Sequence, residues 1–146
     1  MKSIPWLAMC LSVSMLAAAD SIQQVVDPYL KIQSALATDT MDGVAAQAAA
    51  ISQAAEALGA PGKEIKASAV QMERAADLKT ARQAFGSLTA AVLSYAAATK
   101  AALAADVHEA YCPMARKSWL QKGDKTIDNP YYGKSMAGCG EIKKKQ

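Results

Sequence analysis

The stretch GVAAQAAAISQAAEALGAPG, residues 43–62, decides the predicted fold, because a helical seam is followed there by a strong stop. Apolar side chains recur at spacings of three and four residues, which is the pattern of one helix face. These positions are Val44, Ala48, Ile51, Ala55 and Leu58. Asp39 and Thr40 supply capping side chains for a helix over about 41–58. Gly59 and Pro61 end it, since Gly adopts the left-handed conformation and Pro cannot continue a helix.

The same periodicity predicts helices on both sides of this stretch. Residues 21–38 carry one apolar face, interrupted by Pro28, which is expected to bend the helix or delay its start. Further helical patterns cover 63–76 and 77–106, and a break near 76–80 is favoured because one helix over 63–106 would exceed about 60 Å. We therefore predict an all-α fold, an antiparallel three- to four-helix bundle over residues 21–106 with an irregular C-terminal tail over 107–146.

Length and charge indicate one domain and exclude a nucleic-acid binder. The chain has 146 residues and a formal charge of +3, and its basic and acidic residues are too evenly balanced for phosphate neutralisation. An enzyme is not expected, because the sequence has a single His, no nucleophile motif and no nucleotide-binding loop. We predict a single domain over residues 20–146.

The N-terminus has the pattern of a secretory signal peptide over residues 1–19. Lys2 precedes an apolar run from Ile4 to Leu16, and small residues lead up to Ala19. The run is too short to span a bilayer comfortably, so no stable membrane insertion is expected after signal removal. Cleavage after Ala19 would place the protein in the periplasm or outside the cell, where cysteines can oxidise or bind metal.

The tail over residues 107–146 concentrates the residues that carry chemistry. It holds the only His, two of the three cysteines, four of the eight glycines and three of the five tyrosines. We expect an extended segment at 107–112, a helical turn at 117–121 and otherwise a wrapped coil. Asn129 and Pro130 occupy the first two positions of a predicted turn.

Four sulfur-containing side chains in the tail are candidate metal ligands. Cys112 and Met114 can share one side of an extended segment, and Met136 and Cys139 can share one face of a turn. Thiolates and thioethers together favour Cu(I), although other soft or borderline metals remain candidates. His108, four residues before Cys112, is a weaker fifth ligand.

A disulfide between Cys112 and Cys139 is the structural alternative. It would close a loop of about 28 residues and stabilise the fold by roughly 3–4 kcal/mol. Methionine is also common core filler, and Trp119, Tyr131 and Tyr132 are expected to pack the tail rather than to bind a ligand. Residue spacing alone leaves the metal site and the disulfide equally open.

The tail carries the motifs His108-x-x-x-Cys-Pro-Met-Ala, Trp119-Leu and Asn129-Pro-Tyr-Tyr-Gly-x-x-Met-x-x-Cys-Gly. With these motifs, nearly the whole mature chain resembles the DUF3347 family. Weaker matches lie in the helices, at Tyr29-Leu-Lys-Ile and Arg82-x-x-Phe-x-x-Leu. The chain departs from the family pattern at residues 116–118, where the insert before Trp119 is short.

The resemblance implies heavy-metal binding in the periplasm, chiefly of copper, in resistance or efflux. Members of this family occur as small exported proteins and as the C-terminal extension of CusB-like adaptors of heavy-metal efflux pumps. Carried over by position, the expected ligands are Cys112, Met114, Met136 and Cys139, with His108 weaker. The implied partners are the metal ion and an efflux adaptor or another periplasmic metal carrier.

Overall fold

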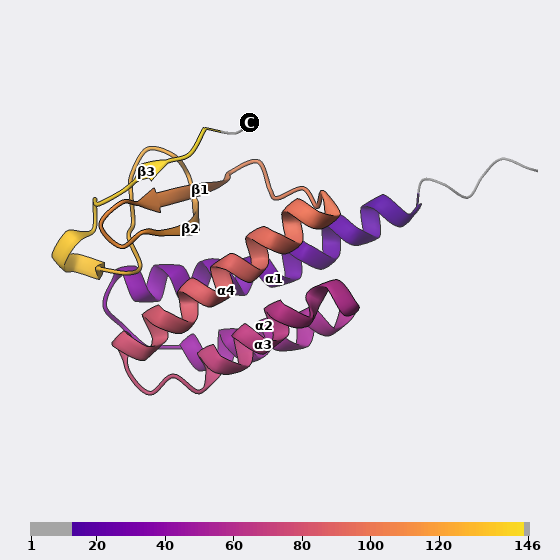
Figure 1. Ribbon diagram of the computed structural model, residues 1–146, viewed down its shortest axis with the longest axis horizontal. Helices are drawn as coiled ribbons and strands as arrows, with labels where there is room; N and C mark the ends of the chain where they lie inside the picture. Colours follow the sequence, from indigo (N-terminus) through magenta and orange to yellow (C-terminus); the bar gives the residue numbers. More distant parts are fainter. Residues whose placement is uncertain (1–12, 145–146) are drawn as a thin grey trace, which may run out of the picture.

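A computed structural model describes residues 13–144 of the chain (Figure 1). Residues 1–12 of the predicted signal peptide lie outside this range. The predicted cleavage position after Ala19 falls within the first helix, α1 (Val13–Ala37), and stays a prediction. None of the described helices combines the length and apolarity that a bilayer crossing needs.

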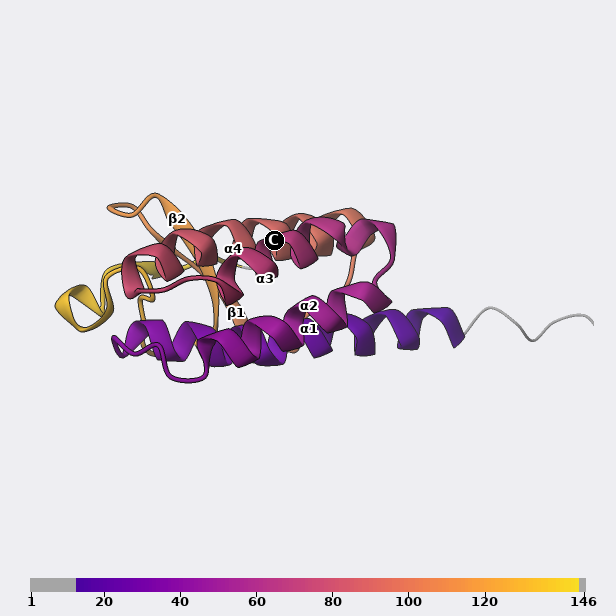
Figure 2. The same cartoon turned by 90° about the horizontal axis from the view of Figure 1, so that it is seen from below.

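Four helices form the larger part of the described structure. After α1 come α2 (Val44–Ala57), the short 3-10 helix η1 (Ala60–Gly62), α3 (Lys63–Glu73) and α4 (Leu78–Thr99). Figure 2 shows α1 and α2 in one layer and α3 and α4 in the other, and successive helices pack against each other. The predicted helices and the break between α3 and α4 are confirmed, and the Asp77 carboxylate caps α4 by accepting from the Thr80 N–H at 2.7 Å.

Three details of the helical prediction are wrong. Helix α4 ends at Thr99 rather than near 106, because Lys100 adopts a left-handed conformation with φ of 54°. Helix α2 is preceded by Gly43 and has no side-chain cap, so Asp39 does not cap it. Helix α1 begins before Pro28 and continues through it, so the delayed start is wrong, whereas the alternative of a bend stays a prediction.

The predicted helix faces form one hydrophobic core. In α2 the buried residues are Val44, Ala48, Ile51 and Ala55, as the seam predicts. Tyr29 of α1 stacks on Phe85 of α4, with ring centroids 4.8 Å apart. The same core cluster continues into the C-terminal part of the chain through Trp119 and Leu120.

The C-terminal part contains a β-sheet, so the all-α prediction with an irregular tail is wrong. Strands β1 (Val107–Cys112), β2 (Lys117–Lys122) and β3 (Glu141–Ile142) form an antiparallel sheet in the order β2-β1-β3. The extended segment at 107–112 is confirmed, whereas the helical turn predicted at 117–121 is strand β2. Trp119, Leu120 and Gln121 are all buried in succession, so β2 lacks the alternation that reveals a half-buried strand.

Strand β2 is the sheet edge that meets the helices (Figure 1). The Leu120 N–H donates to the Tyr29 hydroxyl at 3.1 Å, and the Tyr131 hydroxyl donates to the Ser118 carbonyl at 2.6 Å. Tyr29 also shares a 2.6 Å hydrogen bond with Thr89 of α4. Burial raises the pKa of Tyr29 well above its usual value, so its hydroxyl stays neutral in this network. These contacts cover a sheet edge that would otherwise expose unpaired backbone groups.

Candidate functional site

The two cysteines of the tail meet at one point of the structure. The Sγ atoms of Cys112 and Cys139 lie 2.8 Å apart although 27 residues separate them in sequence. Cys112 is fully buried and Cys139 is half-buried, and both are free thiols. The sequence prediction that the loop between these residues closes is therefore confirmed.

Strand β1 and the turn after it position Cys112. It is the last residue of β1, and the chain then reverses over residues 113–116 into β2. The Ala115 N–H points at the Cys112 sulfur at 3.4 Å. Arg116 closes the turn in a left-handed conformation with φ of 52°. A backbone donor therefore faces the sulfur that ends the strand.

Asn129 positions Cys139 from the middle of the tail. This side chain is fully buried, and its Nδ2 donates to the Cys139 carbonyl at 2.7 Å. Its Oδ1 accepts from the N–H groups of Tyr131 at 2.8 Å and Tyr132 at 3.2 Å. The predicted turn at Asn129 is confirmed, and its amide ties that turn to the backbone that carries the second thiol.

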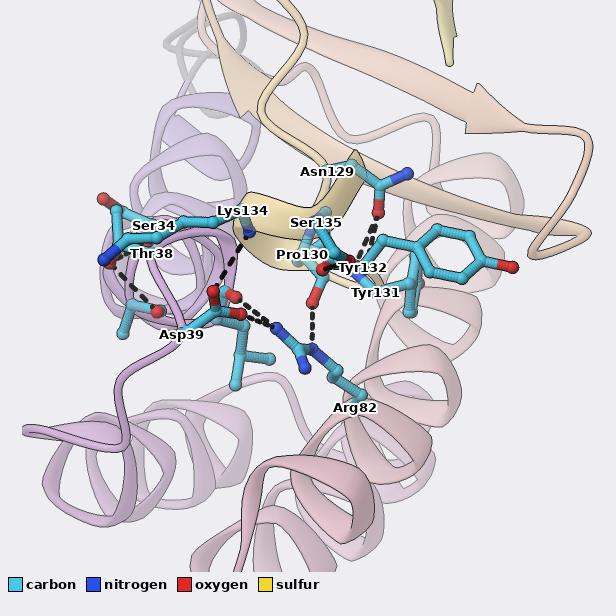
Figure 3. A network of polar contacts seen from close by, with 12 residues as sticks. Ser34, Thr38, Asp39, Arg82, Asn129, Pro130, Tyr131, Tyr132, Lys134 and Ser135 are labelled. Carbon is cyan, nitrogen blue, oxygen red and sulfur yellow. Dashed lines mark hydrogen bonds and ion pairs between the residues drawn. The ribbon is translucent and has the colours of Figure 1, made fainter. Parts of the chain in front are cut away.

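Arg82 of α4 holds the same turn against the helices (Figure 3). Its guanidinium donates to the Pro130 carbonyl at 2.8 Å, to the Leu36 carbonyl at 2.9 Å and to the Asp39 carboxylate at 2.6 Å. The other Asp39 oxygen accepts from the Lys134 N–H at 3.1 Å. The hydrogen bond from Arg82, together with the Lys134 N–H, holds the pKa of Asp39 below its usual value.

Gly133 leaves room for these hydrogen bonds of Arg82 and Asp39, which we call the Arg82 clamp. It has a φ of +56°, and a Cβ there would overlap the Asp39 carboxylate and the Arg82 guanidinium. Sequence reasoning missed the role of Asp39, which was predicted to cap α2. The sequence signal that could have indicated a partner for Asp39 was Arg82, a charged residue spaced by three from the core residue Phe85 on the same helix.

The two thiols have unlike acidities. Burial works to raise the pKa of Cys112, but hydrogen bonds from the Cys139 thiol, from the N–H groups of Ala115 and Met114 and from Asn129 bring it below the usual thiol value. The pKa of Cys139 is raised, first because its thiol proton is shared with Cys112 and then by burial. The pair therefore ionises first at Cys112, and the remaining proton stays on Cys139.

The other predicted ligands are placed less closely. Met114 is 61% exposed, so its thioether lies largely in solvent. Met136 ends the 3-10 helix η2 (Gly133–Met136), is half-buried and accepts the Cys139 N–H through its carbonyl at 3.0 Å. His108 pairs with Gln121 and lies four residues from Cys112, which is roughly 13 Å along a strand. The structure thus brings the two cysteines together and leaves His108 away from them.

Two aromatic residues of the tail pack against each other, and one of them, Trp119, lies beside the segment that carries Cys139. Trp119 is fully buried, and its ring lies edge-on to Tyr131 at 6.1 Å. A Cβ at Gly140 would meet the Trp119 ring at 2.7 Å, so the chain beside Cys139 runs directly over the indole. These contacts give Trp119 and Tyr131 a packing role.

The thiol pair fits a soft ion only after a small movement. Metal–thiolate bonds of about 2.3 Å at a tetrahedral angle would place the sulfurs about 3.8 Å apart. The observed separation is 2.8 Å, so the sulfurs would have to part by about 1 Å. A disulfide bond, at about 2.05 Å, needs a movement of similar size in the opposite direction. Within residues 13–144 no group of three or more His, Cys, Asp or Glu side chains is placed to hold a metal ion.

Comparison with known proteins adds no assignment. No family model, curated protein or solved structure matches the chain. The resemblance to the DUF3347 family therefore stays a prediction.

Proposed function

We propose that this protein is an exported heavy-metal-binding protein that holds Cu(I) through the thiolates of Cys112 and Cys139. The observation that carries the proposal is the 2.8 Å approach of two free thiols at the end of a closed loop. Two convergent thiolates form a ligand set that selects Cu(I) over ions that prefer oxygen. The lowered pKa of Cys112 supports this role, because a thiol must lose its proton before it binds metal.

The thioethers of Met114 and Met136 are the further sulfur ligands of the proposed site. Met114 follows Cys112 by two residues at the exposed turn between β1 and β2, and Met136 precedes Cys139 by three. A largely solvated thioether beside a buried thiolate provides a first ligand for an arriving ion. Met114 is therefore proposed as the residue that passes Cu(I) between solvent or a partner and the buried sulfur.

The cellular role that we propose is buffering of copper or its delivery to efflux in the periplasm. The resemblance to DUF3347 and the signal-peptide pattern support that location and role. The partner would be an efflux adaptor or another periplasmic metal carrier. The helical bundle would then serve as the scaffold for the tail.

An exported structural or adaptor module with a Cys112–Cys139 disulfide is the second candidate. The same close approach of the sulfurs favours it, because a small movement would bring them to bonding distance. Counting free thiols in protein taken directly from the periplasm separates the two candidates. Absence of free thiols combined with no copper uptake after reduction would establish the structural module.

The proposal is tested by titrating reduced protein with Cu(I) against a chromophoric Cu(I) chelator. We expect one tightly bound ion per chain, and we expect Cys112→Ser or Cys139→Ser to lower the affinity by at least a hundredfold. Met114→Leu should weaken binding less and slow the transfer of copper to the chelator, whereas Met41→Leu, on the loop before α2, serves as the matched control. Unchanged loading in both cysteine variants would overturn the proposal.

A further inference from the structure

Gly86 stands in the middle of α4, where glycine is an unfavourable choice. Helix α4 runs from Leu78 to Thr99, so Gly86 is neither a cap nor a turn residue. A glycine inside a helix is destabilising relative to alanine because it orders a more flexible backbone. Its presence therefore points to a need for space on that face of the helix.

The space at Gly86 is taken by the side chain of Lys117. A Cβ on Gly86 would lie 3.3 Å from the Cδ, Cε and Nζ atoms of Lys117. The same Nζ lies 5.2 Å from the centre of the Tyr131 ring. The ammonium group thus lies between the backbone of α4 at Gly86 and the ring of Tyr131.

Lys117 lines a pocket of about 270 Å³ between α4 and the start of β2. Gly86, Ala90 and Leu93 of α4 supply small and apolar lining, and Arg116 stands beside Lys117 on the opposite side. No carboxylate lines the pocket, and in the described part of the chain neither Arg116 nor Lys117 has an ion-pair partner. Two cations beside an apolar floor are complementary to an anion that carries a short apolar body.

We propose that this pocket binds a small organic carboxylate, with the carboxylate on Lys117 and Arg116 and its apolar part over Ala90 and Leu93. A volume of about 270 Å³ lies just below the usual range for ligand sites. It suits a molecule of about ten heavy atoms or fewer. Arg116 can bind both carboxylate oxygens at once, while Lys117 provides a point charge. Lys117 pairs with Cys112 across β1 and β2, but its ammonium lies against α4 and Tyr131, so the carboxylate would bind on the side of the sheet that faces α4.

The test is an amide-shift titration of the ¹⁵N-labelled exported protein with sodium hexanoate. We expect saturable shifts at Gly86 and Ser118, none with the neutral isostere hexanamide, and much weaker binding of acetate and inorganic phosphate, which lack the apolar body. Lys117→Gln and Arg116→Gln should each weaken hexanoate binding by about tenfold, as expected for loss of a charge-assisted hydrogen bond. Lys122→Gln, at the far end of β2, should leave the affinity within twofold.

Gly86→Ala provides a second and opposite readout. The added methyl should raise the melting temperature through better helix propensity, while it displaces the end of Lys117 and weakens hexanoate binding several-fold. A variant that is both more stable and weaker in binding cannot be explained by misfolding. Equal binding of hexanoate and hexanamide, or full affinity in either Lys117→Gln or Gly86→Ala, would overturn the proposal. None of these outcomes depends on whether the protein binds copper.

Discussion

At the scale of single residues, the site depends on how one thiol sets the acidity of the other. The Cys112 and Cys139 thiols share a hydrogen bond, and this contact is the largest of the contributions that lower the pKa of Cys112. Burial of Cys112 opposes it. A protonated Cys139 therefore stabilises the Cys112 thiolate relative to the thiol.

Replacing Cys139 with Ala should raise the pKa of Cys112, because the variant loses the hydrogen bond that lowers this pKa while the burial that raises it remains. Alkylation of Cys112 in this variant would reach its half-maximal rate at a higher pH than alkylation of Cys112 in the wild-type protein. The measurement is the rate of reaction with iodoacetamide across the alkaline pH range, with Ser135→Ala as a control at an exposed hydroxyl nearby. A Cys112 pKa in Cys139→Ala that is unchanged or lower would contradict this account.

At the scale of elements, the Arg82 clamp joins the tail to the ends of two helices. It binds the carbonyl of Leu36 in α1 and that of Pro130 in the turn that leads to η2. The clamp thereby fixes the segment that carries Met136 and Cys139, while β1 independently fixes Cys112. The approach of the two thiols thus depends on the helices as well as on the sheet.

Arg82→Gln should destabilise the fold by roughly 2 kcal/mol, because it removes several hydrogen bonds from a guanidinium that is largely buried. It should also make a disulfide formed between Cys112 and Cys139 by oxidation easier to reduce, since the segment carrying Cys139 is less well held. Urea unfolding and equilibration in glutathione buffers measure the two effects. Lys66→Gln, which breaks the exposed ion pair with Glu56, is the matched control and should leave the disulfide unchanged.

Arg82→Lys should restore part of both properties, since lysine can still pair with Asp39 but cannot bridge two carbonyls in a fixed fork. A loss of stability in Arg82→Gln with an unaltered thiol–disulfide equilibrium would show that the clamp does not position Cys139.

The sequence was sufficient to predict the helices but not the sheet, for a physical reason visible in particular elements. In α2 one face is buried and the other is solvated, so Val44, Ala48 and Ile51 show the helical period clearly. In β2 both faces are covered, and Trp119 and Gln121 are buried on one side while Leu120 is buried on the other. A short strand buried on both faces has no alternating pattern to detect.

At the site, sequence spacing predicted the closed loop but not its supports. Cys112 and Cys139 stood out by residue type, whereas Asp39 and Arg82 act through contacts that span more than forty residues. Met114 and His108 were close to Cys112 in sequence, yet one lies largely in solvent and the other lies far along β1. Proximity in sequence did not predict convergence of side chains.

At the scale of the whole molecule, the helical bundle carries a small sheet (Figure 1), and both thiols lie at one end of its β1–β3 pair. Cys112 ends β1, and Cys139 lies two residues before β3, the strand that pairs beside it. The antiparallel pairing of β1 with β3 therefore fixes both sulfurs on one framework. A bound ion or a disulfide would lock this pairing and tie the C-terminus to the sheet.

X-ray absorption at the copper edge of the Cu(I)-loaded protein shows which atoms coordinate the ion. We expect a first shell of sulfur only, with its two thiolate scatterers lost in the double variant Cys112→Ser/Cys139→Ser. A first shell that contains nitrogen from His108, or one that is unchanged in the double variant, would contradict it.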